Sequence, residues 1–392
     1  MKNTLPIVLG LTTLLVSCNN DDDNNSLTSN PGNSIPFEEL VVPAPEVVHI
    51  QELASDISND NFLVVGSTDG STANTTVLMA YGTDNQMQSS GQVIHNGHYT
   101  TAHQIQDVSM HSDGSYFMLY NSLSGNMSDW FVDDLSSDFS QLQTAFSGQM
   151  NNFNVKQLFV ESSGNVLIGA EAVLNTADSG IVISRYSAGG SLIDSIHLND
   201  TLYLGVRDIK VSSEGTVLVL VDTYPDNGND RSGRVYELSY DLSQVLNTYH
   251  FGDGAHQENY EMLVVPNGFA FCGHSSSRNG THDPVLYSYK DSAQDSSIIA
   301  LAGHNGFHDA VLHPATGRIF AVGRSGEQNV SDQALIGHTS QQVNDISYQI
   351  DGFSDRSYYT DVTSANNQYV IAGGAQFDAN GVEHPLLVLY KR

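Results

Sequence analysis

A unit of about 50 residues recurs along most of the chain, and this repetition restricts the possible folds more than any other feature of the sequence. Each copy has an acidic or polar residue, a short apolar run, a polar turn that usually ends in Gly, and a second, strongly apolar run. The six clear copies begin at Asp107, Gln157, Asp208, Glu261, Asp309 and Asp361. A degenerate seventh copy precedes them and begins at Ala54. The second apolar runs end 50–54 residues apart, so the chain builds one structural unit seven times.

A third apolar run follows in each unit, and in several units a fourth can be recognised. Residues 235–240 and 245–251 are examples of the third and the fourth run. These runs are too short and too rich in β-branched residues to be helices, so we interpret them as strands. Four short antiparallel strands in each of seven units are typical of propeller blades. The sequence therefore predicts an all-β fold, a seven-bladed β-propeller of four-stranded antiparallel blades, over residues 37–392.

The two ends of the repeat array are expected to meet. The seventh unit stops at Arg392 after its third strand, so it lacks a fourth. The N-terminal runs at residues 37–42 and 46–50 are the two candidates for the missing strand. Either one would cover an otherwise exposed sheet edge and join the last blade to the first.

The first 36 residues have the layout of an export and anchoring signal. Lys2 precedes a short apolar stretch at residues 5–17, which is too short to span a bilayer as a helix. The stretch ends in Leu15-Val16-Ser17-Cys18, which resembles the lipobox of bacterial lipoproteins. The resemblance implies a signal peptide at residues 1–17 and lipidation of Cys18 with acyl chains such as palmitate.

Residues 18–36 are acidic and polar and contain no apolar surface to bury, so we expect a disordered tether. The acidic run directly after Cys18 resembles the surface-export signal of Bacteroidetes lipoproteins, although a solvated spacer has the same composition. The resemblance implies a protein anchored to the outer membrane, facing the cell exterior.

Several repeat units resemble a known class of propeller repeats. Residues 185–195, 208–221 and 235–245 are similar to the delta-60 and SBBP repeats of secreted bacterial proteins. This resemblance extends over most of residues 50–392 and implies a surface or secreted propeller. It carries a fold rather than a reaction, so chemistry has to be argued from a site.

The charge of the chain excludes some partners. A formal net charge of −30 argues against binding to nucleic acid and to an anionic membrane surface. The remaining partners are an extracellular glycan or another surface protein, together with the membrane through the lipid on Cys18.

Propeller geometry predicts where a binding site lies. The connections between the second and third strands and those between blades are expected to be long and to share one face, where binding residues gather. We place Trp130 and Arg324 on this face as well. The residues nominated for ligand binding are His98, His103, Tyr203, Arg207, His256, Tyr260, His274, Arg278, His308, Arg356 and Tyr358.

Three functions remain open. The first is capture of a glycan by aromatic and hydrogen-bonding side chains. The second is a protein-interaction scaffold. The third is a polysaccharide lyase that uses an Arg, a base and an acid, for which the candidates are His256, Tyr260, His308, Arg207 and Arg356. No catalytic motif is present, which favours a protein that is not an enzyme.

No metal site or other cofactor is predicted. Residues 226–230 are rich in oxygen ligands, so Ca²⁺ is a weak candidate there, but the spaced pattern of an EF-hand is missing. Cys272 lies in an apolar run and is expected to be a small core residue.

Overall fold

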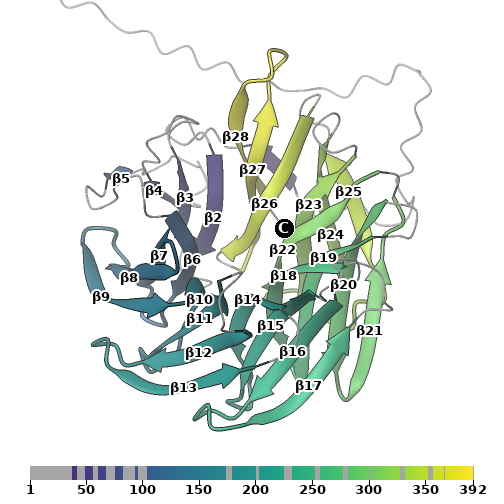
Figure 1. Ribbon diagram of the computed structural model, residues 1–392. Helices are drawn as coiled ribbons and strands as arrows, with labels where there is room; N and C mark the ends of the chain where they lie inside the picture. Colours follow the sequence, from purple (N-terminus) through teal and green to yellow (C-terminus); the bar gives the residue numbers. More distant parts are fainter. Residues whose placement is uncertain are drawn as a thin grey trace, which may run out of the picture.

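The repeats fold into seven four-stranded antiparallel sheets arranged around a central axis in the computed structural model (Figure 1). This confirms the seven-bladed β-propeller. In the described part of the chain, no helix has the length and apolar character needed to cross a membrane. The structure describes residues 38–41, 49–55, 61–67, 76–82, 93–95, 104–173, 179–199, 203–224, 232–251, 257–276, 281–301, 303–326, 332–351, 356–365 and 367–391.

The strands of each blade follow one another from the axis to the rim. Blade 1 contains β2 (His49–Ser55), β3 (Asn61–Ser67), β4 (Thr76–Gly82) and β5 (Val93–His95). Blade 2 contains β6 (Gln104–Met110), β7 (Tyr116–Ser124), β8 (Met127–Leu135) and β9 (Leu142–Asn151). Blade 3 contains β10 (Phe153–Val160), β11 (Val166–Ala172), β12 (Ile181–Tyr186) and β13 (Leu192–Leu198). Blade 4 contains β14 (Tyr203–Val211), β15 (Val217–Tyr224), β16 (Ser232–Leu238) and β17 (Val245–Phe251).

The remaining three blades follow the same plan. Blade 5 contains β18 (Gln257–Val265), β19 (Gly268–Ser276), β20 (His282–Lys290) and β21 (Ala293–Ile298). Blade 6 contains β22 (Gly306–His313), β23 (Arg318–Ser325), β24 (Gln333–Thr339) and β25 (Ser347–Asp351). Blade 7 contains β26 (Arg356–Ala365), β27 (Tyr369–Phe377), β28 (Glu383–Lys391) and the N-terminal strand β1 (Glu38–Val41).

The N-terminal strand β1 closes the ring, because it is the fourth strand of blade 7. β1 pairs antiparallel with β28, from Glu38 opposite Lys391 to Val41 opposite Val388. The first of the two candidate runs is therefore the closing strand. The last two residues of the other candidate, His49 and Ile50, begin the innermost strand of blade 1. Covering the outer edge of β28 ties the two ends of the array together.

The turn between the first and second strands depends on glycine. Gly114, Gly164 and Gly215 have φ values of 86°, 80° and 83°, which side chains with a Cβ rarely adopt. In each turn the glycine N–H donates to a carbonyl three residues earlier, such as that of His111. The short polar turn read from the repeat is therefore a tight hairpin turn.

Blade 2 departs from the expectation of a long connection between its second and third strands. β7 and β8 are joined by Gly125 and Asn126 alone. As a result Trp130, which the sequence placed on a loop, lies within β8 and is 3% exposed. Its ring packs against Phe146 and Tyr186, so it is a core residue and that prediction is wrong.

Every innermost strand carries a register shift at the same place. One residue of blade 2, for example, is left unpaired between Ile105 and Asp107, as expected for a β-bulge. The equivalent shifts lie between 50 and 52, 155 and 157, 206 and 208, 259 and 262, 307 and 309, and 359 and 361. The bulge is therefore a property of the repeat.

The acidic residue of the repeat follows the bulge and bonds to the next blade. Asp107 accepts a hydrogen bond of 2.7 Å from the backbone N–H of Leu158. The same bond joins Asp208 to the N–H of Met262 at 2.8 Å. It recurs from Asp309 to Val362 at 2.6 Å and from Asp361 to Leu53 at 3.0 Å. In blade 1 the residue after the bulge is Glu52, so the repeat begins there and not at Ala54 as the sequence suggested.

These carboxyl groups are crowded and hard to ionise. Burial raises the pKa of Asp107 to about 7. Burial and the charge of its neighbours also raise the pKa of Asp309 and Asp361, which hydrogen-bond to each other. Burial works against the charge of Lys210, but Asp208 and Glu261 outweigh it and raise the pKa of the ammonium. Lys210 lies 3.1 Å from Asp208 and 2.6 Å from Glu261.

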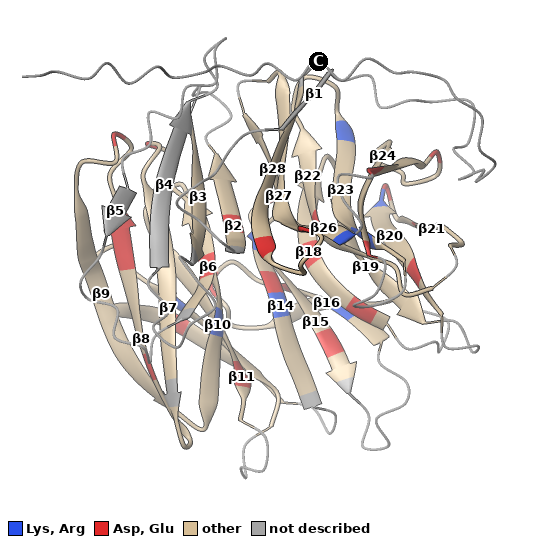
Figure 2. Cartoon of the chain, turned by 90° about the horizontal axis from the view of Figure 1, so that it is seen from above, with Lys and Arg blue, Asp and Glu red and all other residues tan. Residues whose placement is uncertain are grey.

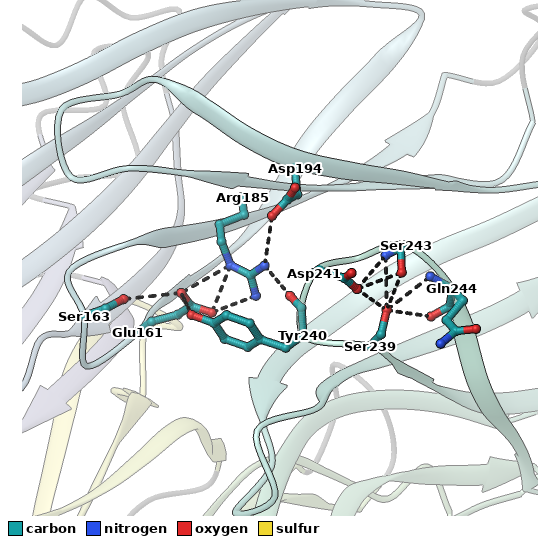
Figure 3. A network of polar contacts seen from close by, with 9 residues as sticks. All are labelled: Glu161, Ser163, Arg185, Asp194, Ser239, Tyr240, Asp241, Ser243 and Gln244. Carbon is teal, nitrogen blue, oxygen red and sulfur yellow. Dashed lines mark hydrogen bonds and ion pairs between the residues drawn. The ribbon is translucent and has the colours of Figure 1, made fainter.

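A buried ion pair within blade 3 is linked to blade 4 through Tyr240 (Figure 3). The guanidinium of Arg185 bonds to Glu161 at 2.9 Å, and both side chains are almost fully buried. Arg185 also donates to the carbonyl of Tyr240 in the turn after β16 and lies over the Tyr240 ring. Because an unpaired buried charge is costly, this contact favours one position of blade 4 against blade 3.

Substitution of Asp361 tests whether the buried carboxyl groups that follow the bulges are hard to ionise. Because its pKa is raised in the fold, the ionised form is disfavoured, and the wild type is expected to lose stability as the pH rises above the unfolded value near 3.9. Asp361→Asn retains an acceptor for Leu53 and offers an N–H to Asp309. We expect it to be more stable than the wild type at pH 8, by a margin that shrinks toward pH 5, in urea denaturation.

Asp361→Ala is the matched variant, because it also removes the charge but leaves the Leu53 N–H without an acceptor. It should be about 1–3 kcal/mol less stable than Asp361→Asn at both pH values. A difference between the wild type and Asp361→Asn that does not change with pH would contradict the raised pKa.

Candidate functional site

The unpaired bulge residues lie at equivalent positions of the innermost strands and so form a ring around the propeller axis. Neighbours in this ring touch from blade to blade. Lys156 donates to Gln106 at 3.2 Å, and the rings of Tyr260 and His308 lie 5.6 Å apart, edge to face. The bulge residues are Gln51, Gln106, Lys156, Arg207, Tyr260, His308 and Thr360, and in blade 5 Glu261 is unpaired as well.

Tyr260 is the centre of the chemically richest part of this ring. Its hydroxyl donates to Glu258 at 3.0 Å and lies 3.3 Å from Nδ1 of His274. Its ring is 5.9 Å from the ring of His274 and contacts that of His308 on the other side. His308 is itself fixed, because its Nδ1 lies 3.0 Å from the carbonyl of Tyr359 in blade 7. Side chains from blades 5 and 6 therefore meet here.

Two further histidines extend the cluster outward. The His282 ring lies 4.6 Å from the ring of His274 and 4.7 Å from that of His304. Gly306 permits this approach, because a Cβ there would meet His274 at 3.2 Å. Three imidazoles from blade 5 and from the segment that leads into blade 6 thus lie in a row with their rings tilted against one another.

Asn305 holds the outer histidines in place. It is 1% exposed, donates to the carbonyl of His282 at 2.9 Å and accepts from the N–H of Gly326 at 3.0 Å. The backbone N–H of His304 also donates to the Gly326 carbonyl at 2.7 Å. Because these bonds fix the backbone on both sides, the row of histidines stands on a rigid support.

Two arginines supply positive charge. Arg207 is 30% exposed, and its Nε donates to the fully buried Asp222 at 2.8 Å. Asp222 also accepts from the backbone N–H of Asn259, so it ties Arg207 to blade 5. Arg324, at the end of β23, is half-buried and near enough to affect the pKa of Tyr260, His282 and His308. Figure 2 shows acidic and basic residues on the same inner strand, as on β14.

The pKa values of His308 and Tyr260 lie far from neutral pH, so each side chain has a single protonation state there. Removal from water, together with the charge of Arg324, lowers the pKa of His308 to about 4. Burial raises the pKa of Tyr260 to about 12. At neutral pH both side chains are neutral and serve as hydrogen-bonding groups with an aromatic face. We use the name Tyr–His–Arg cluster for Arg207, Tyr260, His274, His282, His304, His308 and Arg324.

The structure brings together four of the residues nominated from the sequence, namely Arg207, Tyr260, His274 and His308. They lie on strands and not on the expected loops, because each innermost strand starts before its bulge and pairs with an extended second strand. That part of the prediction is wrong.

Three other nominated residues also lie on strands. Arg356 and Tyr358 are in β26, where the Arg356 guanidinium covers the Phe377 ring at 4.0 Å and the Tyr358 hydroxyl donates to Glu383 at 3.4 Å. Tyr203 begins β14 opposite Tyr224. Five further nominated residues lie outside the described part of the chain: Cys18, His98, His103, His256 and Arg278.

Some members of the cluster carried a signal that the sequence analysis did not use. The residue directly before the acidic residue of each repeat is the bulge residue, and this rule would have selected Lys156, Arg207, Tyr260 and His308 together. His282, His304 and Arg324 follow no such rule, because they come from different parts of two blades. Within the described residues, no group of three or more His, Cys, Asp or Glu side chains has an arrangement that could hold a metal ion. Residues 226–230, the weak Ca²⁺ candidate, are outside that part.

No protein-family model and no curated protein sequence matches the chain. Solved structures share its fold. The periplasmic gluconolactonase PpgL of Pseudomonas aeruginosa is 12% identical, with a TM-score of 0.54 over 84% of this chain and 96% of that one. A candidate 6-phosphogluconolactonase of Bacteroides fragilis is 11% identical, with a TM-score of 0.54 over 88% and 95%.

A third similar structure has a binding partner. Sqt1 of Chaetomium thermophilum, solved with the N-terminus of ribosomal protein L10, is 10% identical, with a TM-score of 0.51 over 90% of this chain and 89% of that one. At such identities the likeness shows the fold alone. The chain is a β-propeller protein, and its propeller-fold neighbours include both enzymes and binding proteins.

Asn305→Ala tests the support of the cluster. The variant leaves the Gly326 N–H without its acceptor, so we expect a loss of about 1–3 kcal/mol of unfolding free energy in urea denaturation. Asn247→Ala is the control, because Asn247 is exposed on β17 and its bonds to Glu237 and Tyr249 lie at the surface; it should change stability by less than about 0.5 kcal/mol. Equal stability of the two variants would show that Asn305 supports nothing.

Proposed function

We propose that the propeller binds an extracellular glycan at the Tyr–His–Arg cluster. The observation that carries this proposal is the meeting of half-buried aromatic and imidazole rings with arginine. Aromatic faces stack on the apolar faces of sugar rings, while Tyr, His and Arg donate hydrogen bonds to hydroxyl groups. The rigid inner strands and Asn305 keep these groups in place before a ligand arrives, which reduces the entropic cost of binding.

Binding is favoured over elimination chemistry by the protonation states in the cluster. A general base or acid works best with a pKa close to the working pH. The pKa of Tyr260 is about 12 and that of His308 about 4, so neither is poised near neutrality. The polysaccharide lyase is therefore the weaker interpretation of the same residues.

The proposed setting is the outer surface of a bacterium. The lipobox-like segment that ends at Cys18 supports a lipid anchor in the outer membrane, and the delta-60 and SBBP-like repeats support a surface propeller. Labelled palmitate should be incorporated into the protein in the producing cells and should be absent from the Cys18→Ala variant. Equal labelling of the wild type and the Cys18→Ala variant would contradict a lipid anchor at Cys18.

An interaction scaffold is the second candidate, and one observation favours it. The outer strands of blades 3 to 5 expose large apolar side chains, including Leu192 at 57%, Ile193 at 47% and Ile298 at 52%. Exposed apolar groups that lie together mark protein-interaction surfaces. A scaffold would retain no glycan, so the same binding experiment separates the two functions.

The binding experiment uses a panel of neutral and acidic oligosaccharides with the purified propeller. We expect at least one to be retained, and Tyr260→Ala and His308→Ala to weaken that binding about 10-fold or more through loss of ring contact and hydrogen bonding. His250→Ala is the matched control, because His250 is exposed on the outer strand β17, and it should bind as the wild type does. Thermal melting confirms that each variant folds. Retention of no glycan would overturn the proposed function.

A further inference from the structure

Arg324 differs from the other arginines of the described chain in having no partner there. The described arginines pair with acidic groups in most cases: Arg185 with Glu161, Arg207 with Asp222 and Arg318 with Asp345. Within the same described residues, the side chain of Arg324 makes no hydrogen bond and no ion pair. Its strand neighbours are the small residues Gly306 and Ala334, which provide no counter-charge.

The surroundings of Arg324 are polar but neutral. Its charge acts on His282, His308, Tyr260 and Tyr358, which come from three blades. Burial and Arg324 together lower the pKa of both histidines, and burial raises the pKa of both tyrosines to about 12. At neutral pH none of these four groups carries a negative charge that would neutralise the guanidinium.

The described carboxylates that act on these groups already accept hydrogen bonds, and Asp283 beside His282 accepts one from the N–H of Leu301 at 3.1 Å. Glu258 accepts a hydrogen bond from Tyr260 at 3.0 Å, and Glu383 accepts one from Tyr358 at 3.4 Å. Among the described residues, the half-buried guanidinium therefore has no bound anionic partner and can accept an anion from outside the protein. The planar fork of an arginine matches the two oxygens of a carboxylate.

We propose that Arg324 binds the carboxylate of an acidic sugar, so that the ligand of the Tyr–His–Arg cluster is a uronic-acid glycan. This inference rests on the proposed glycan-binding function and specifies the class of sugar. One unpaired cation in a chain of net charge −30 suits a singly charged group better than a phosphate or sulfate cluster, which would call for several cations. Tyr260 and the row of histidines then contact the ring and the hydroxyl groups of the same sugar.

The test measures binding of trimers of galacturonate, glucuronate and mannuronate by calorimetry, each beside its methyl ester, which has the same ring without the charge. We expect at least one acid trimer to bind, and its ester to bind about 10- to 100-fold more weakly, as loss of a charged hydrogen bond implies. Arg324→Gln should weaken binding of the acid to the level of the ester and leave binding of the ester unchanged. Arg324→Lys should lie between, because it keeps the charge without the fork.

Arg318→Gln is the matched control. Arg318 lies on the same strand, β23, but at its opposite end, where it pairs with Asp345 and His338. It should bind the acid trimer as the wild type does.

Two results would overturn the assignment of the carboxylate to Arg324 while leaving glycan binding intact. One is equal binding of acid and ester with no effect of Arg324→Gln. The other is binding of neutral glycans alone from the wider panel. Binding of no glycan of either kind would overturn the proposed function itself, and this inference with it.

Discussion

The hydrogen bond that a backbone N–H of one blade donates to a carboxyl group of the preceding blade determines how the ring is assembled. In four blades the aspartate after the bulge makes it, at 2.6–3.0 Å. A bulge is needed for this geometry, because the extra residue re-aims the side chain that follows it. The bond that starts at Asp361 reaches Leu53, so it joins blade 7 to blade 1 from inside, while β1 joins the same region from outside through β28.

The odd number of blades breaks the alternation of residue types among the seven residues that follow the bulges. From blade 1 to blade 6, longer side chains (Glu52, Gln157 and Glu261) alternate with aspartates, and the aspartates reach the neighbouring backbone. Seven positions cannot alternate all the way around, so two aspartates, Asp309 and Asp361, stand side by side and hydrogen-bond to each other. Burial is the largest cause of the raised pKa of both groups. The charge of Asp361 and the hydrogen bond between them raise the pKa of Asp309 further, whereas the same bond lowers the pKa of Asp361. Between Asp208 and Glu261, the ammonium group of Lys210 offsets the negative charge of the carboxylates.

The repeat period was sufficient to predict the number of blades and closure by an N-terminal strand, because those follow from spacing and from apolar runs. It left two runs open as the closing strand. The bulge was beyond prediction, since one unpaired residue changes neither the period nor the hydrophobic pattern. That is why Tyr260 and His308 were expected on loops, and why the first copy was started at Ala54 instead of Glu52. Trp130 was misplaced for a related reason: β7 and β8 extend into a two-residue turn, and exposed and buried strand ends have similar compositions.

The unpaired bulge residue and the residue that follows it have different roles. This difference explains how one scaffold holds both a repeated geometry and a local site. In four blades the aspartate after the bulge carries the bond between blades, so its role is structural. The bulge residue itself makes no ladder bond and is therefore free to vary: it is Gln51 or Thr360 in one part of the ring and Arg207, Tyr260 or His308 in another. The reactive side chains are consecutive, in blades 4 to 6, where Asn305 and Gly306 bring His274, His282 and His304 alongside them. A ligand would therefore sit off the axis, over these three blades, rather than along it.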